Sequence, residues 1–184
     1  MKSRKLLPWL LASFALKLAL PMSAHAFGDA RARPELTTVP HVNLERYLGR
    51  WYEIASIPQS FQKGCTATRA TYSAREDGSI DVLNECNLET VDGRLKQAHG
   101  RAKVVDRESN SKLKVTFFWP FYGDYWIVDL GPDYEYAAVG APNREYLWIL
   151  SRGTTLDEST YSQILSKMSD KGFDVSRLVK QIQP

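Results

Sequence analysis

The sequence is poor in the residues that build metal centres and nucleophilic active sites. It contains only two cysteines and three histidines among 184 residues. His25 lies in the leader described below, His41 precedes the first predicted strand, and His99 has outward parity on a later strand. None of them is spaced as part of a metal-ligand cluster or as a ligand for haem iron. We therefore expect no metal, no cofactor and no enzymatic activity.

A long apolar run suited to a membrane-spanning helix is also missing. The N-terminal apolar run, over residues 6–20, is short and is interrupted by Lys17. Basic residues precede it at positions 2, 4 and 5, and the small-x-small sequence Ala24-His25-Ala26 follows it. This order is typical of a secretory signal peptide, so we predict that residues 1–26 are cleaved before Phe27. An uncleaved membrane anchor is the alternative.

Little net charge remains once this leader is removed. The chain has 24 basic and 21 acidic residues, and four of the basic ones lie in residues 1–26, where there are no acidic residues. Residues 27–184 thus carry 20 basic and 21 acidic residues. The basic character belongs to the leader, so we expect no binding to nucleic acid. Residues 27–41 are expected to form an extended, poorly ordered lead-in, and residues 42–184 a single domain.

Short stretches of strand-like alternation, separated by turn residues, follow the lead-in. The predicted strands are residues 50–56, 66–74, 79–86, 96–105, 112–118, 125–130, 134–141 and 145–152. Asp-Gly and Pro-Asn pairs in the links indicate hairpin turns. Eight strands joined by hairpins favour an antiparallel up-and-down β-barrel with room for about one small ligand. The same spacing also permits a two-sheet sandwich.

One helix is predicted after the strands. Its apolar residues recur at helical spacing on a single face; they are Tyr161, Ile164, Leu165 and Met168. Acidic residues at positions 157 and 158 suit its N-terminus, and Lys171-Gly172 ends it. A helix with one apolar face is expected to pack on the outside of a closed barrel, and residues 175–181 are expected to add a last short strand.

Three short motifs lie where a barrel of this topology brings them to one end. Gly49-x-Trp51 opens the first strand, Asp133-Tyr134 lies between the sixth and seventh strands, and Arg152 ends the eighth. We name this end the floor and the opposite end the mouth. The set resembles the three conserved blocks of the lipocalin family, in which the arginine stacks across the tryptophan. The stretch YLGRWYEIA at residues 47–55 is similar to the bacterial lipocalin and apolipoprotein D branch, and the resemblance extends over residues 42–181.

The resemblance has implications for fold and function. It implies an all-β fold, an eight-stranded antiparallel up-and-down β-barrel with one C-terminal α-helix packed on the outside. It implies a structural floor, because a guanidinium over an indole forms a cation–π contact; the floor residues are Gly49, Trp51, Asp133, Tyr134 and Arg152. It also implies binding, storage or transport of a small hydrophobic ligand, a fatty acid, lysophospholipid or similar lipid, in a bacterial cell envelope.

Alternation, with Trp51 taken as inward, predicts which side chains line the lumen. On the last strand the parity is taken from the resemblance. The predicted ligand-binding residues are Tyr72, Ile80, Val82, Ala98, Ala102, Leu113, Val115, Phe117, Tyr125, Tyr146 and Trp148. Small residues at positions 98, 100 and 102 are expected to leave volume in the lumen. A filled barrel without a cavity is the alternative.

Glu53 is the polar residue that stands out among the inward positions of the first strand. We expect it to be paired near the floor rather than to act as an acid or base. A lipid-modifying enzyme of the lipocalin fold is the second hypothesis for function. It would require a nucleophile or an acid–base set in the lumen, and the sequence supplies no clear one.

Aromatic residues occupy the links predicted at the mouth. Phe61 lies in the first link, and Trp119, Phe121 and Tyr122 lie between the fifth and sixth strands. Exposed apolar side chains on loops are costly unless they cover something. They are predicted to contact the ligand, a membrane surface or a second copy in a homodimer, and packing within the loop is an equal alternative. An envelope interaction protein that uses this aromatic mouth is the third hypothesis.

The two cysteines, Cys65 and Cys86, are expected to form one disulfide in an exported protein. They are near-opposite on the hairpin of the second and third strands but have opposite parity, so an irregular backbone near Cys65 is required. No cysteine lies near the cleavage site, in contrast to outer-membrane lipoprotein relatives. We therefore expect a soluble periplasmic protein, with outer-membrane association as the alternative, and not a lipoprotein.

Overall fold

The computed structural model describes residues 34–184. Within them the elements are α1 (Leu44–Tyr47), β1 (Gly49–Ser56), η1 (Ser60–Gln62), β2 (Cys65–Ala74), β3 (Ile80–Leu88), β4 (Leu95–Val104), β5 (Lys112–Phe118), β6 (Phe121–Leu130), β7 (Tyr136–Gly140), β8 (Leu147–Ser151), α2 (Glu158–Asp170), η2 (Val175–Arg177) and β9 (Val179–Lys180). The predicted signal peptide and residues 27–33 of the lead-in lie outside the described residues.

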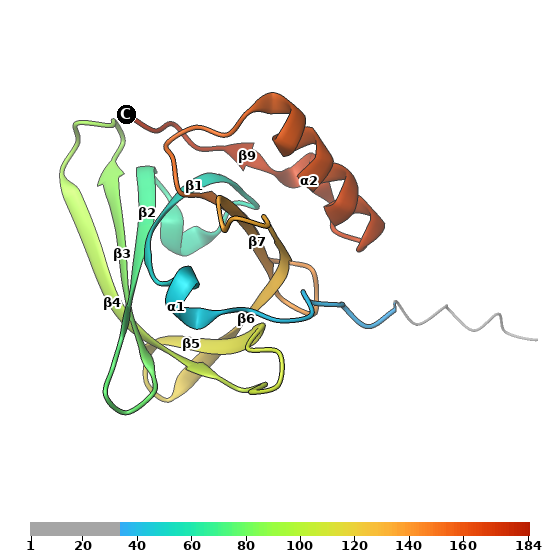
Figure 1. Cartoon of the computed structure of the whole chain (residues 1–184). Coiled ribbons are helices and arrows are strands. Elements are labelled where there is room, and N and C mark those ends of the chain that lie inside the picture. Colours follow the sequence, from blue (N-terminus) through green and yellow to red (C-terminus); the bar gives the residue numbers. More distant parts are fainter. Residues whose placement is uncertain (1–33) are drawn as a thin grey trace, which may run out of the picture. The chain divides into compact units, whose positions relative to one another are not determined.

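The strands form a closed barrel (Figure 1). Antiparallel neighbours follow one another from β2 to β8, β8 pairs with β1, and β1 pairs back to β2. The predicted up-and-down barrel is therefore confirmed. The two-sheet sandwich is excluded because a sandwich would leave unpaired edges where β1 meets β2 and β8.

The hairpin of β5 and β6 is longer than predicted. β6 begins at Phe121 rather than at Tyr125, because Phe118 already pairs with Phe121 across a two-residue turn. That turn is Trp119-Pro120, with a cis peptide bond. Phe121 and Tyr122, which were predicted to lie on a loop, thus belong to strand β6, and Trp119 lies in the turn.

The C-terminal segment completes the wall between β1 and β2. These two strands pair directly only over Gly49–Tyr52. Toward the mouth they diverge, and β9 pairs with Ala55 and Ser56 of β1. The Ala67 amide donates to the Ile182 carbonyl at 2.8 Å, and the Gln183 side-chain amide donates to the carbonyls of Glu53 and Thr68. The expected last strand is present only over Val179–Lys180, since Val175–Arg177 form η2, and the residues after the strand bridge β1 and β2.

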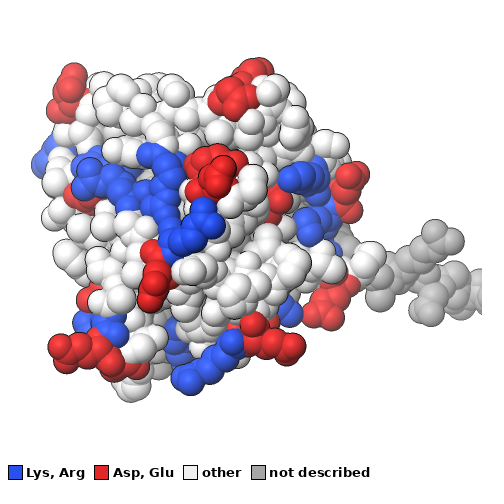
Figure 2. All heavy atoms as spheres, viewed as in Figure 1, with Lys and Arg blue, Asp and Glu red and all other residues white. Residues whose placement is uncertain are grey.

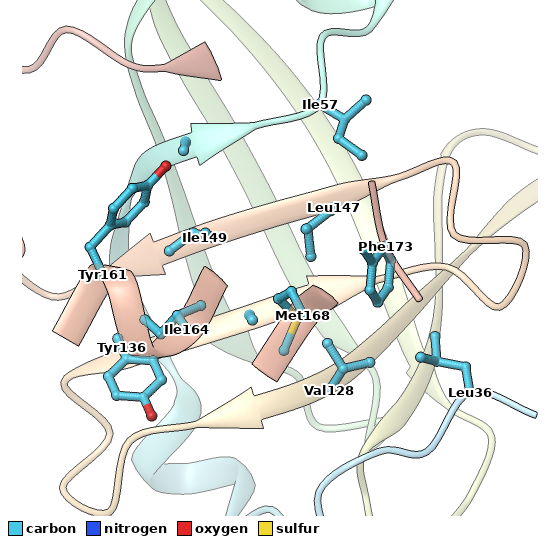
Figure 3. Packing of buried hydrophobic residues seen from close by; sticks show 12 residues of the cluster. Leu36, Ile57, Val128, Tyr136, Leu147, Ile149, Tyr161, Ile164, Met168 and Phe173 are labelled. Carbon is cyan, nitrogen blue, oxygen red and sulfur yellow. The ribbon is translucent and has the colours of Figure 1, made fainter. Parts of the chain in front are cut away.

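Helix α2 packs on the outer face of the barrel, as predicted (Figure 1). Its buried residues Tyr161, Ile164 and Met168 meet the outward side chains of β8 and its neighbours, among them Leu147 and Ile149 (Figure 3). Asp157 caps the N-terminus through its side chain, which accepts a hydrogen bond from the Thr160 amide. The alternation on β8 is thereby settled, because Leu147 and Ile149 face the helix while Trp148 and Leu150 face the lumen.

Residues 34–41 of the lead-in are extended and lie on the barrel. Leu36 is only 2% exposed and belongs to the same apolar cluster as α2. The Val39 amide donates to the Ile127 carbonyl at 3.0 Å. The expectation of poor order is wrong for these residues, because burial of Leu36 and the hydrogen bond from Val39 to the barrel strand β6 hold them in place.

Charges of both signs are mixed over the surface. On the face seen in Figure 2, Lys and Arg side chains lie beside Asp and Glu side chains. None of the helices within residues 34–184 has the length and apolar character needed to cross a membrane.

Candidate functional site

The inward face of the barrel changes from buried to exposed along β4 and β5 from floor to mouth. On β4, Ala102 is buried, Gly100 is intermediate and Ala98 is exposed. The same order holds on β5 for Leu113, Val115 and Phe117. We name the mouth half, whose inward side chains on these two strands remain accessible to solvent, the open half.

The floor half, in contrast, is packed. Trp51 is fully buried, and Tyr47 of α1 packs against it with ring centroids 5.0 Å apart. The Tyr125 hydroxyl is hydrogen-bonded to the hydroxyls of Tyr47 and Tyr72 at 2.8 and 2.9 Å. Burial raises the pKa of Tyr72 to about 12 and raises the pKa values of Tyr47 and Tyr125 well above the ordinary range. These phenols are therefore neutral at ordinary pH.

The predicted lining residues divide between these two halves. Five are buried in the packed half, and Tyr125 is partly buried beside them; the five are Tyr72, Ile80, Val82, Ala102 and Leu113. The other five lie in the open half, and these are Ala98, Val115, Phe117, Tyr146 and Trp148. The second set is exposed to solvent at least in part, whereas the five buried residues are not. Their role in binding remains a prediction.

One small residue does not leave the space expected of it. A Cβ atom added at Gly100 would lie 2.7 Å from the Phe117 ring. The ring of Phe117, on the neighbouring strand β5, thus occupies the space that a side chain at position 100 of β4 would fill. Among the three small residues of β4, Ala98 is the one that faces open space.

The floor is sealed by Arg152. Its guanidinium carbon lies 3.8 Å from the centroid of the Trp51 ring, and its nitrogens donate to the carbonyls of Arg46, Arg50 and Tyr134. Gly49 has φ +91°, a backbone conformation that residues with a side chain rarely adopt, so a larger residue there would be strained; an added Cβ would lie at contact distance, 3.4 Å, from the Arg152 Nη1 atom.

The other two floor residues lie at the rim of this seal. The Tyr134 hydroxyl accepts a hydrogen bond from the Asn43 amide at 2.8 Å, which ties the β6–β7 link to the start of α1. Asp133 is exposed and lies 3.9 Å from Arg46. The structure therefore brings the predicted floor residues to one end, with Asp133 in a peripheral position.

A buried polar network that the sequence indicated only in part lies above the packed half. Glu53 Oε2 accepts a hydrogen bond from Gln62 Nε2 at 2.7 Å, and Gln62 Oε1 accepts one from Trp148 Nε1 at 3.2 Å. Burial raises the pKa of the Glu53 carboxyl. Its partner comes from η1 in the mouth link, so the expectation of a partner near the floor is wrong. No periodic pattern marks a link residue such as Gln62, and its polarity alone gave no signal.

The predicted disulfide between Cys65 and Cys86 is present. The pairing of β2 with β3 shifts register between Thr66 and Arg69, and Ala67 has φ +48°. This irregular backbone is what the opposite parity of the two cysteines requires.

The tip of the β5–β6 hairpin is an exposed aromatic surface. Phe118, Trp119 and Phe121 are 82%, 81% and 76% exposed, and Phe117 and Tyr122 are exposed beside them. The Lys103 ammonium lies 4.4 Å from the centroid of the Tyr122 ring. We name Phe118, Trp119 and Phe121 the aromatic tip. Within residues 34–184 these rings do not pack into the molecule, so packing within the loop is excluded.

Comparison with known proteins identifies the family. The family described as a lipocalin-like domain matches residues 42–183, which is the whole barrel with α2 and β9. The chain belongs to the lipocalin family. Members of this family bind small hydrophobic ligands.

Several relatives match over most of their length. Temperature-induced lipocalin-1 of Arabidopsis thaliana is 44% identical over 160 residues, covering 82% of this chain and 84% of the relative. The outer membrane lipoprotein Blc of Escherichia coli K12 is 39% identical over 149 residues, covering 81% and 84%. Apolipoprotein D of Macaca fascicularis is 37% identical over 179 residues, covering 89% and 92%.

Solved structures with lower sequence identity share the fold. Insecticyanin of the tobacco hornworm superposes with a TM-score of 0.66 at 18% identity, covering 83% of this chain and 87% of that one. Lobster apocrustacyanin A1 gives 0.63 at 20% identity, covering 77% and 80%.

Proposed function

We propose that this lipocalin binds and carries a single-chain lipid, a fatty acid, lysophospholipid or similar molecule, in the mouth half of its barrel. The observation that carries the proposal is that the inward apolar side chains of Val115 and Trp148 are only partly buried and that of Phe117 is exposed. Burial of each methylene group of an acyl chain contributes about 0.8 kcal/mol. A chain of moderate length therefore supplies micromolar binding even after the costs of ordering it.

We further propose that the protein works in a cell envelope after export. The signal-like leader supports export, and the relatives include proteins named as outer membrane lipoproteins. A soluble periplasmic carrier, associated with the outer membrane through contacts rather than through an acyl anchor, fits the sequence of this chain.

Blocking the lumen tests the lipid proposal. Ala98→Trp places an indole in the open half at a position that is already exposed, so the fold is expected to tolerate it. His99→Trp adds the same side chain at the next residue of β4, on the outward face, and is the matched control. We expect organic extraction and mass spectrometry to recover lipid from the wild type and from His99→Trp but not from Ala98→Trp.

Two other outcomes would count against carriage. Absence of lipid from every extract, together with no binding of added dodecanoic acid or lysophosphatidylcholine, would contradict it. Chemically altered lipid released without a stable complex would favour the enzyme hypothesis instead.

The aromatic tip supports a second proposal, contact with a membrane surface during loading or delivery. Aromatic side chains are favoured at membrane interfaces, and Lys103 beside Tyr122 can place its ammonium at the head-group level. The tip extends from the mouth, where a lipid would enter.

Vesicles test this contact directly. Phe118→Ser should weaken co-sedimentation with phosphatidylcholine–phosphatidylglycerol vesicles, whereas Val105→Ser, an exposed apolar residue near the floor, should not. If neither variant changes sedimentation but Phe118→Ser converts a dimer to a monomer in analytical ultracentrifugation, the tip is a homodimer contact and the membrane proposal fails.

A further inference from the structure

Glu53 is a charged residue buried inside the barrel. It is 3% exposed, whereas the other buried charged residues of the described part of the chain, Glu85 and Arg144, lie on the outer face of β3 and in the β7–β8 link. Glu53 pairs with Leu150 across the β1–β8 ladder. It therefore stands just above the packed floor half, at the deep end of the open half.

The orientation of its hydrogen-bonding partner follows from chemistry. The indole N–H of Trp148 can only donate, so the Gln62 group that it meets at 3.2 Å is the amide oxygen. The Gln62 NH₂ group must then point at Glu53, where it donates to Oε2 at 2.7 Å. Gln62 cannot reverse its amide without losing both contacts.

The second carboxyl oxygen, Oε1, is buried and has no hydrogen-bond partner within residues 34–184. The side chains of Ser56 and Gln181 lie near the carboxyl and partly offset the rise in its pKa, but neither donates to Oε1. None of the ion pairs among the described residues involves Glu53. A buried oxygen of this kind is costly to leave unpaired, so it is a place for a ligand group.

We propose that Glu53 Oε1 is the deep polar anchor of the lipid site, and that it binds a hydroxyl group of the ligand. This inference rests on the lipid-binding function proposed above and narrows its ligand class. A hydroxyl can donate to a carboxylate and can also accept from a neutral carboxyl group, so it satisfies Oε1 in either protonation state. A fatty-acid carboxylate at the same depth would place two negative charges side by side away from water, which is unfavourable.

The surroundings of the anchor suit an apolar chain that leads away from it. Trp148 and Tyr146 lie next along β8 toward the mouth, with stacked rings whose centroids are 5.8 Å apart. A lipid alcohol bound by Glu53 thus extends its chain past these rings toward the mouth, with its hydroxyl at the bottom of the open half.

Matched ligands test this assignment. The affinities of dodecan-1-ol and dodecanoic acid for the delipidated protein are measured by calorimetry at pH 7.5. Since a hydrogen bond to a charged or buried carboxyl is worth a factor of about ten or more, we expect the alcohol to bind about tenfold more tightly than the acid.

Glu53→Gln is expected to reverse the preference. Gln62 Nε2 requires an acceptor, so it holds the new amide oxygen in place of Oε2 and turns the amide NH₂ into the position of Oε1. That NH₂ donates to a carboxylate, and the acid then binds at least as tightly as the alcohol. Glu76→Gln, an exposed residue in the β2–β3 turn, is the control and should keep the wild-type preference.

A second variant guards against loss of folding. Glu53→Met has nearly the same size and no polar group, so it should bind both ligands with equal affinity. Equal affinity of the wild type for alcohol and acid, or an alcohol preference that survives in both Glu53 variants, overturns the anchor while leaving lipid binding intact. If the wild type binds neither ligand, the anchor and the lipid-binding proposal both fail.

Discussion

Arg152 shows how much of the floor depends on one side chain. The guanidinium lies over the Trp51 ring and donates to carbonyls of α1, β1 and the β6–β7 link. Arg46 and Arg50 are close in sequence, but Tyr134 and Arg152 lie far from them along the chain, so one side chain ties the start of the first strand to the β6–β7 link. Its planar fork of donors is what allows one residue to do this.

Replacing Arg152 by lysine is expected to lower the free energy of unfolding by about 2 kcal/mol, because one ammonium cannot reach three carbonyls that the fork reaches together. Urea denaturation followed by tryptophan fluorescence measures the change. Arg50→Lys, at an exposed position of β1, is the control and should leave stability unchanged. Equal midpoints for the two variants would show that the floor does not need the fork.

Residue-level prediction succeeded where a motif exists and failed where only loop geometry decides. Gly49, Trp51 and Arg152 could be assigned to one end because their order and strand parity fix where they meet. Gln62 could not, since its contact with Glu53 depends on how residues 57–64 fold back over the wall. The depth at which the lumen opens was also not predictable, because it depends on Tyr47 of α1 filling the floor half.

At the scale of elements, the N-terminus of α2 is capped by the side chain of Asp157, whose carboxyl group titrates. Hydrogen bonds from Ser159 and Thr160 to the Asp157 carboxylate lower its pKa to about 2. A lowered pKa contributes stability that is present above the unfolded-state value of about 3.9 and is lost as the pH falls toward the folded-state value. The cap therefore stabilises the helix at neutral pH and ceases to do so in acid.

Asp157→Ala should consequently lower the melting temperature at pH 7, and the difference from the wild type should shrink as the pH falls from about 4 to about 2. Circular dichroism of thermal unfolding across this range measures it. Asp170→Ala, at the exposed C-terminal end of the same helix, should not lower the melting temperature. A difference that is constant with pH would show that the carboxylate charge plays no part.

The strand and helix pattern was predictable for most elements and failed at the β5–β6 hairpin. Every one of residues 117–122 except Pro120 is aromatic, so there is no alternation of apolar and polar side chains from which a strand register could be predicted. Pairing of Phe118 with Phe121 decides the turn, and that contact is visible only in three dimensions.

For the whole molecule, closure of the barrel depends on the C-terminal segment. Backbone bonds link Gln181 to Ile54 and Ile182 to Ala67, and the Gln183 side chain bridges Glu53 and Thr68. The predicted up-and-down order gave the sequence of strands, but it did not show that β1 and β2 separate toward the mouth.

Removing residues 181–184 is expected to lower the free energy of unfolding by about 2 to 6 kcal/mol, because four hydrogen bonds at about 0.5–1.5 kcal/mol each are lost. Chemical denaturation provides the measurement. Removal of Pro184 alone, which is exposed, should have no effect. Full stability of the longer truncation would mean that β1 and β2 close the wall without this segment.

The C-terminal segment that lies between β1 and β2 also constrains when the barrel can be completed. The first strand pairs with β2 only over Gly49–Tyr52, and the mouth end of the same edge is completed by residues 179–183, which lie more than 120 residues later in the chain. A nascent chain still lacking residues 179–183 at the ribosome exit thus has an unfinished wall. Completion of the barrel wall is therefore tied to the arrival of residues 179–183.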